Sequence, residues 1–246
     1  MTRISRDALS LIQSEFMQFS HYPKETLPFL KAIRDNNTKE WFDAHRDEYE
    51  NYILDPSRAF VEEMGEHLQA LVPTINAIPK INQSLFRIYR DIRFSKDKTP
   101  IKSKIGVIFW QGTHIRMQSS CFYLHFSPQE LLIASGIRTF DPDLLAAYRE
   151  YIKVDANRES LDSILNVLKK KGYHVEEPQY KRLPKGFDKE ISLEYLTRMK
   201  AVAVFHSLPA STISKKKLIP ELFKHYEQFL PLQQWLYQMT LTKKVD

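Results

Sequence analysis

The spacing of apolar residues changes twice along this chain, and that change restricts the possible folds more than any other feature. Up to about residue 72, apolar side chains recur every three or four positions, as Leu27, Leu30 and Ile33 do, which is typical of amphipathic helices. Between residues 85 and 137 apolar and polar residues alternate, with many aromatic and β-branched side chains, and this pattern predicts strands. Helical spacing returns after residue 141. Helices, then strands, then helices predict an α+β fold.

Five strands are expected, at residues 85–94, 101–110, 121–126, 130–137 and 200–206. The first four follow one another through short connections, which join antiparallel neighbours. We therefore predict a mainly antiparallel β-sheet flanked by α-helices that pack on one face. Helix boundaries are expected at an Asn37–Glu40 capping box, at Asp55–Pro56, at Asp141–Pro142, at Asn157, at the basic run before Gly172 and at Pro231.

The chain has 246 residues, of which 43% are hydrophobic and 12% aromatic, so it can bury a large core. It shows no Gly/Ser linker and no repeat, which predicts a single α+β domain over residues 23–246 after a helical extension at residues 1–22. Cys121 is the single cysteine, and the longest apolar run, residues 105–110, is far too short to span a membrane. A cytoplasmic protein without a membrane partner is therefore expected.

Positive charge is concentrated in one part of the sequence. The net charge is +6, and residues 87–104, here called the cationic segment, carry seven basic and two acidic residues, or +5 of that total. Such a local excess attracts anions. The candidate ligand-binding residues of this segment are Arg87, Tyr89, Arg90, Arg93, Lys96, Lys98, Lys102 and Lys104.

Alternation along a strand divides the start of the cationic segment between two faces. One face carries Arg87, Tyr89, Asp91 and Arg93. There the guanidinium groups would hold a phosphate or carboxylate, Tyr89 would orient the ligand, and Asp91 would either hold an arginine or act as a catalytic base. Arg90 lies on the other, apolar face, where a guanidinium needs a carboxylate or carbonyl partner. The alternative is an exposed edge strand that its Lys and Arg side chains keep soluble.

The run from Phe86 to Pro100 (FRIYRDIRFSKDKTP) resembles the signature of a family of bacterial and fungal proteins known as domain of unknown function 2461. Further segments that resemble this family are Phe29-Leu30, Asn36-Asn37, Glu40-Trp41-Phe42, Tyr123-Leu124-His125 and Leu183-Pro184-Lys185-Gly186-Phe187-Asp188. Together they span about residues 27–230, and Ile101 departs from the aromatic residue that is more common there. The resemblance implies a shared fold and motif, and it brings no catalytic roles with it.

Other residues capable of chemistry form no recognisable motif. Cys121 and His125 share a face of their predicted strand but lie ~13 Å apart along it, so Cys121 is interpreted as a small buried hydrophobe. The histidines lack zinc-like spacing, and neither a P-loop nor a dinucleotide fingerprint occurs. Acids and lysines of the cationic segment, such as Asp91 and Lys98, leave a metal-assisted reaction open, as does a metal site assembled from distant residues. No metal site is predicted, and any cofactor is unknown.

Three functions fit these features. The leading hypothesis is that the chain binds a phosphate- or carboxylate-bearing small molecule, with or without catalysis, through a strand–turn–strand formed by the cationic segment. The second is a nucleic-acid-binding module that contacts phosphates without reading sequence. The third is a protein-interaction domain with an acidic partner. The reaction, the ligand and the oligomeric state stay open.

Overall fold

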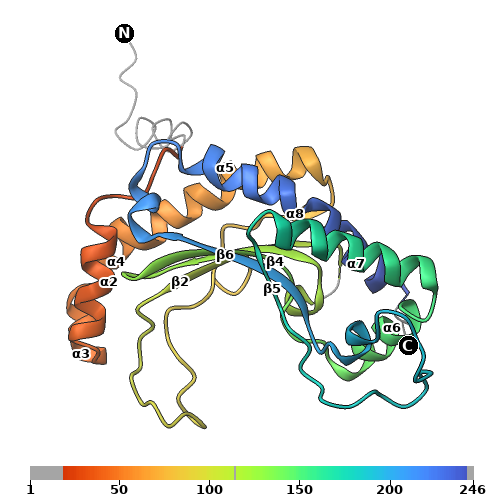
Figure 1. The fold of residues 1–246 in the computed structure, drawn as a ribbon. Coiled ribbons are helices and arrows are strands. Elements are labelled where there is room, and N and C mark those ends of the chain that lie inside the picture. Colours follow the sequence, from red (N-terminus) through yellow and green to blue (C-terminus); the bar gives the residue numbers. More distant parts are fainter. Residues whose placement is uncertain (1–18, 114, 243–246) are drawn as a thin grey trace.

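The computed structural model describes residues 19–113 and 115–242, and its centre is one antiparallel sheet. The six strands are β1 (Ile75–Asn76), β2 (Ile105–Gln111), β3 (Cys121–Phe126), β4 (Glu130–Ile137), β5 (His174–Val175) and β6 (Val202–Pro209). They are ordered β1-β2-β3-β4-β6-β5, and each pair of neighbours is antiparallel. The fold is the predicted α+β arrangement of an antiparallel sheet flanked by helices (Figure 1).

Helices precede and follow the central strands, as the apolar spacing predicted. The α-helices are α2 (Thr26–Asp35), α3 (Lys39–Ala44), α4 (Arg46–Tyr49), α5 (Asp55–Leu71), α6 (Pro142–Tyr151), α7 (Asp155–Lys170) and α8 (Leu218–Leu241). A π-helical turn, η1 (Glu50–Leu54), joins α4 to α5, and 3-10 turns occupy η2 (Arg116–Gln118), η3 (Glu194–Arg198) and η4 (Ala210–Ser214). In Figure 1, α5 and α8 lie across one face of the sheet.

The core lies between that face and these two helices. Phe122, Leu124 and Phe126 of β3 are buried toward the helices. Tyr226 of α8 packs on Phe122 with ring centroids 5.1 Å apart, and its hydroxyl donates to the Tyr123 carbonyl at 3.2 Å. Because side chains alternate along a strand, Cys121, Tyr123 and His125 point to the opposite face. We call the face opposite α5 and α8 the open face.

Two of the predicted strands, 121–126 and 130–137, match β3 and β4, and the predicted strand 200–206 corresponds to β6. The predicted strand 85–94 is wrong, because that stretch pairs with the next one only through isolated bridges, Leu85 with Val107 and Tyr89 with Ile101. Leu85 and Tyr89 are four residues apart, whereas their partners Val107 and Ile101 are six apart. The second segment therefore has two extra residues, which bulge out around Lys104. A bulge interrupts the ladder and redirects side chains.

Two of the helix signals act as predicted. The Asp141 side chain accepts from the Leu144 amide at 2.8 Å and caps α6. Gly172 adopts a φ of +85° just after α7, a conformation that glycine reaches without strain.

Other helix signals were wrong. Thr38, and not Asn37, caps α3 by accepting from the Trp41 amide at 3.1 Å. The boundary at Asp55–Pro56 is where α5 begins, with the proline in its first turn, but Asp55 is the first residue of the helix and not its cap, because the π-helical turn runs directly into α5. Asn157 lies inside α7, where its side chain donates to the Tyr151 carbonyl at 3.0 Å, and α8 continues through Pro231.

The predicted extension at residues 1–22 falls largely outside the described residues, which begin at Phe19. Within them, Phe19 and Tyr22 are buried in the same hydrophobic cluster as the sheet and the helices. The Tyr22 amide donates to the Ile213 carbonyl at 3.0 Å. The end of the predicted extension is therefore part of the packed core. Across residues 19–113 and 115–242, no helix is both long and apolar enough to cross a membrane.

Candidate functional site

A cavity of about 370 Å³ lies on the open face, which we call the open-face cavity. Its floor is made of the side chains that the strands turn away from the helices, among them Cys121, Tyr123 and His125 of β3. The register places Ala134 opposite Tyr123 and Leu132 opposite His125, so β4 contributes small and apolar neighbours. Such a cavity, mostly apolar with a few polar groups, is typical of small-molecule sites.

Three cations and one carboxylate line the open-face cavity among the residues that the structure describes. Lys104 comes from the bulge before β2, Arg116 from η2, Arg138 from the end of β4, and Glu176 follows β5. These four residues come from four separate parts of the chain. The balance of charge around the cavity is positive, which favours an anionic occupant.

Arg116 is fixed against the aromatic wall of the cavity. Its guanidinium lies 4.5 Å from the centre of the Phe86 ring and donates to the Gln83 carbonyl. Burial lowers the pKa of Arg116, although a guanidinium remains charged at neutral pH. The group thus presents a fixed positive charge beside an apolar surface.

Gly106 allows the aromatic wall to stand close to the floor. A Cβ atom at Gly106 would lie 3.1 Å from the Phe86 ring and 3.1 Å from the Tyr123 hydroxyl. The two rings meet edge to face, with centroids 5.9 Å apart. A side chain at position 106 would push Phe86 away from Tyr123.

Tyr123 and His125 of the floor contact each other, and His125 also contacts Glu130, which lies beside the cavity. The Tyr123 hydroxyl lies 3.4 Å from His125 Nδ1, and His125 Nε2 lies 3.5 Å from Glu130 Oε1. Burial raises the pKa of Tyr123 to about 12, and Arg138 opposes this rise. Burial, followed by the charge of Lys104, lowers the pKa of His125 below its usual 6.5, while Glu130 opposes the change. The imidazole is therefore neutral at pH 7.

Cys121 also faces the cavity, but its thiol stays protonated. Burial raises the pKa of Cys121 to about 12, and the S–H donates to the Gly136 carbonyl at 3.2 Å. Because the thiolate is the nucleophilic form, the thiol is inert at neutral pH.

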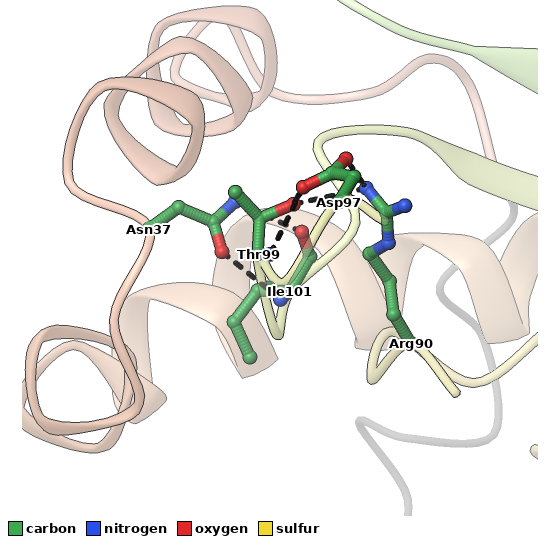
Figure 2. Close-up of polar contacts among 5 residues, drawn as sticks. All are labelled: Asn37, Arg90, Asp97, Thr99 and Ile101. Atoms are coloured by element: carbon green, nitrogen blue, oxygen red, sulfur yellow. Dashed lines mark hydrogen bonds and ion pairs between the residues drawn. The ribbon is translucent and has the colours of Figure 1, made fainter. Parts of the chain in front are cut away.

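Of the eight predicted binding residues, Lys104 is the one that lines the open-face cavity. Arg90 is held within its own loop, where it donates to Asp97 and to the Thr99 hydroxyl at 2.9 Å (Figure 2). Asp97 in turn accepts from the Thr99 amide at 3.0 Å and from its hydroxyl at 2.8 Å. Arg90 thus has the carboxylate partner that the sequence predicted, although it lies in a partly exposed loop and not on a buried strand face.

The other end of the loop is attached to the N-terminal helices. Asn37 accepts from the Ile101 amide at 3.0 Å and donates to the Ile101 carbonyl at 2.9 Å, as Figure 2 shows. Asn37 lies between α2 and α3, so this pair of bonds connects segments 64 residues apart.

Most of the remaining cations of the segment also bind their own loop. Arg93 holds Asp91 through two bonds of 2.7 and 2.9 Å, which keeps the pKa of Asp91 well below its usual range and makes that carboxylate a weak base. Lys98 donates to the Ile92 carbonyl at 2.9 Å, and Lys102 donates to the Arg87 carbonyl at 2.7 Å.

The other three predicted binding residues also lie outside the lining of the open-face cavity. The Tyr89 hydroxyl accepts from Arg46 at 3.2 Å, so it faces the junction of α3 and α4. Arg87 and Lys96 are exposed on the loop. The cationic segment is thus a loop held largely by hydrogen bonds among its own residues, and Lys104 is its residue at the cavity.

Sequence reasoning did not single out Arg116 and Arg138, and it mentioned Tyr123 and His125 only through the family resemblance and strand alternation. The alternation did place Cys121 and His125 on one face, where the structure inserts Tyr123 between them. Arg116 and Arg138 lie outside the strands, and no local pattern marks them as neighbours. In the described part of the chain, no three His, Cys, Asp or Glu side chains are grouped as metal ligands would be.

A comparison with protein families places the chain in a known family model. The family model described as conserved hypothetical protein (DUF2461) matches residues 25–235, which include all six strands and the loop of the cationic segment. No curated protein matches the chain.

Proposed function

The chain belongs to the DUF2461 family of conserved hypothetical proteins, and we propose that it binds an anionic small molecule in the open-face cavity. The observation that carries this proposal is the placement of Lys104, Arg116 and Arg138 around a mostly apolar cavity of about 370 Å³. Since the single cysteine needs no oxidising compartment, the proposal includes a cytoplasmic location.

The chemistry of the lining suggests the class of ligand. Guanidinium groups such as Arg116 and Arg138 bind carboxylates and phosphates through paired N–H donors, and Lys104 adds a point charge. Phe86, Ile108 and Phe205 supply apolar walls for an uncharged part of the ligand. The best fit is a compound with one carboxylate or phosphate and an apolar or aromatic body.

This proposal keeps the anionic ligand that the sequence suggested, but it assigns binding to residues of the open-face cavity and not to the cationic segment as a whole. The expected strand–turn–strand holds most of its cations against its own carbonyls and carboxylates, where they stabilise the loop. Lys104 is the member of the cationic segment that remains in the binding set.

Thermal-shift screening of carboxylated and phosphorylated metabolites, followed by calorimetry of compounds that raise the melting temperature, tests this function. Arg138→Ala should weaken binding of such compounds about tenfold or more, because a charge-assisted hydrogen bond contributes about 1.5–3 kcal/mol. Lys96→Ala removes the same charge from an exposed position outside the cavity and should leave affinity within about twofold. The proposal fails if no compound stabilises the protein, or if both variants bind alike.

A second candidate function, binding of single-stranded nucleic acid by the cationic segment, is favoured by Phe94. This ring is 96% exposed, and the Arg93 guanidinium lies 5.9 Å from its centre. A large aromatic side chain held in solvent beside cations can stack on a base while the cations contact phosphates. The loop contacts of Arg90 and Asn37 would hold Phe94 in a defined position.

Fluorescence anisotropy with labelled single-stranded oligonucleotides tests this second function. If it is correct, binding is micromolar at low salt, and Phe94→Ala weakens it about fivefold or more, since stacking contributes about 1–3 kcal/mol per base. Ile115→Ala, which also removes an exposed apolar side chain, serves as the control. Absence of binding at low salt, or equal binding by both variants, rules this function out.

A further inference from the structure

We propose that Tyr123, His125 and Glu130 form a proton-transfer chain that begins on the floor of the open-face cavity and through which the bound anion loses a proton. This inference rests on the proposed binding function and adds a reaction class to it. The substrate would be a carboxylate or phosphate compound that also carries a hydroxyl or an activated C–H bond.

The topology of the sheet places the three groups together. Tyr123 and His125 are two residues apart on β3, so they share the open face. His125 pairs with Leu132 of β4, and Glu130 is two residues from Leu132 on the same face, diagonally beside His125. The contacts of 3.4 Å from Tyr123 to His125 and 3.5 Å from His125 to Glu130 connect them in a line. Contacts of this length in a free site can tighten when a substrate binds.

The far end of the chain is anchored. The Ser207 hydroxyl on β6 donates to Glu130 Oε2 at 2.7 Å, which leaves Oε1 directed at His125. Glu130 is therefore a positioning residue, which sets the tautomer of the imidazole by accepting from Nε2–H. Nδ1 is then unprotonated and can accept from the Tyr123 hydroxyl.

The charges around His125 suit a proton acceptor. Lys104 near the start of β2 and Arg138 after β4 disfavour the imidazolium, whereas Glu130 favours it. The imidazole is thus neutral in the free protein and gains a stabilising carboxylate contact once it is protonated. Arg138 also favours negative charge at Tyr123.

The proton balance of the step is simple. The substrate X–H bond breaks, and its proton goes to the Tyr123 oxygen, while the original Tyr123 proton moves to His125 Nδ1. The electron pair remains on the substrate, and Arg138 and Lys104 stabilise the added negative charge. His125 ends as an imidazolium paired with Glu130, and the reverse sequence returns the proton. No oxidant or reductant is needed.

Nitrogen NMR of the free protein, labelled with 15N at the histidine rings, tests the chain without any ligand. At neutral pH, His125 should show an unprotonated Nδ1 and a protonated Nε2. Tyr123→Phe should move the Nδ1 resonance to higher frequency because it removes the hydrogen-bond donor. Glu130→Gln should lower the pKa of His125, because the carboxylate favours the charged ring. Both replacements keep the shape of the side chain, so the fold should be retained.

A matched control is available elsewhere in the protein. The Tyr173 hydroxyl lies 2.9 Å from His225 Nδ1, and neither residue lines the open-face cavity. Tyr173→Phe should change the His225 resonances and leave those of His125 in place. A proton on Nδ1 of His125, or an Nδ1 resonance that does not respond to Tyr123→Phe, overturns the proton-transfer chain. Because this readout needs no ligand, failure of the chain is distinguishable from failure of anion binding.

Discussion

Arg90 is a residue of the cationic segment whose hydrogen bonds stabilise its own loop. The sequence predicted an acidic or carbonyl partner for Arg90 on a buried strand face, and the residue instead binds Asp97 and Thr99 in a partly exposed loop. Hydrogen bonds from Thr99 first, and then from Arg90, lower the pKa of Asp97, so the carboxylate stays charged at neutral pH. A run of charged residues in a sequence can therefore reflect hydrogen bonds that stabilise a loop and need not mark a binding surface.

Substitution of Arg90 should loosen this loop. In Arg90→Ala, Asp97 loses a partner, and we expect the Thr99 and Lys102 amides to exchange with solvent about threefold or more faster, because local opening becomes easier. Arg93→Ala, whose partner Asp91 lies outside this network, is the control and should leave these two amides unchanged. Hydrogen exchange followed by NMR measures both variants, and equal exchange in all three proteins would contradict the assignment.

At the scale of elements, the bulge before β2 decides what the cationic segment can reach. The two extra residues between the bridges at Leu85–Val107 and Tyr89–Ile101 break the ladder that the alternating pattern predicted. The same bulge carries Lys104 to the cavity, and Gly106 directly after it receives the Phe86 ring. The irregularity that made the strand prediction wrong thus builds one wall of the candidate site.

Gly106→Ala tests this close approach. The added methyl would lie 3.1 Å from both Phe86 and the Tyr123 hydroxyl, so the ring or the strand must shift. We expect the free energy of unfolding to fall by about 1–3 kcal/mol, because overpacking of a well-packed site destabilises the fold, and we expect weaker binding of the proposed anion. Urea denaturation measures the first effect. A loss below about 0.5 kcal/mol would mean that Phe86 moves aside freely.

At the scale of the whole molecule, the free energy of unfolding should depend on partly buried histidines such as His225. Burial first, and then His206, lower the pKa of His225 below 6.5, and Glu221 opposes the change. A lowered pKa in the folded state means that the unfolded state binds the proton more tightly. The contribution of neutral His225 to the free energy of unfolding is therefore complete above pH 6.5, and it is lost as the pH falls through the folded-state pKa of His225.

His225→Gln should reduce this dependence on pH. Urea midpoints of the wild type should decrease from pH 7.5 to pH 5.5, and the variant should show a smaller decrease, because one titrating group has been removed while an amide can still bond to Tyr173. His125 contributes in the same direction, so some dependence should remain. An unchanged slope in the variant would contradict the role assigned to His225.

The sequence by itself determined the α+β order of elements, the bounds of β3 and β4 and the Asp141 cap, because each depends on neighbours within a few residues. It also located the excess charge and placed Cys121 and His125 on one face. Only the tertiary structure decided which cations meet at a cavity. Strand pairing brings Arg116 and Arg138 to Lys104 from distant positions, and a bulge of two residues around Lys104 carries that side chain to the cavity. The physical reason is that local patterns encode which face a side chain takes, whereas register and long-range pairing decide what that face meets.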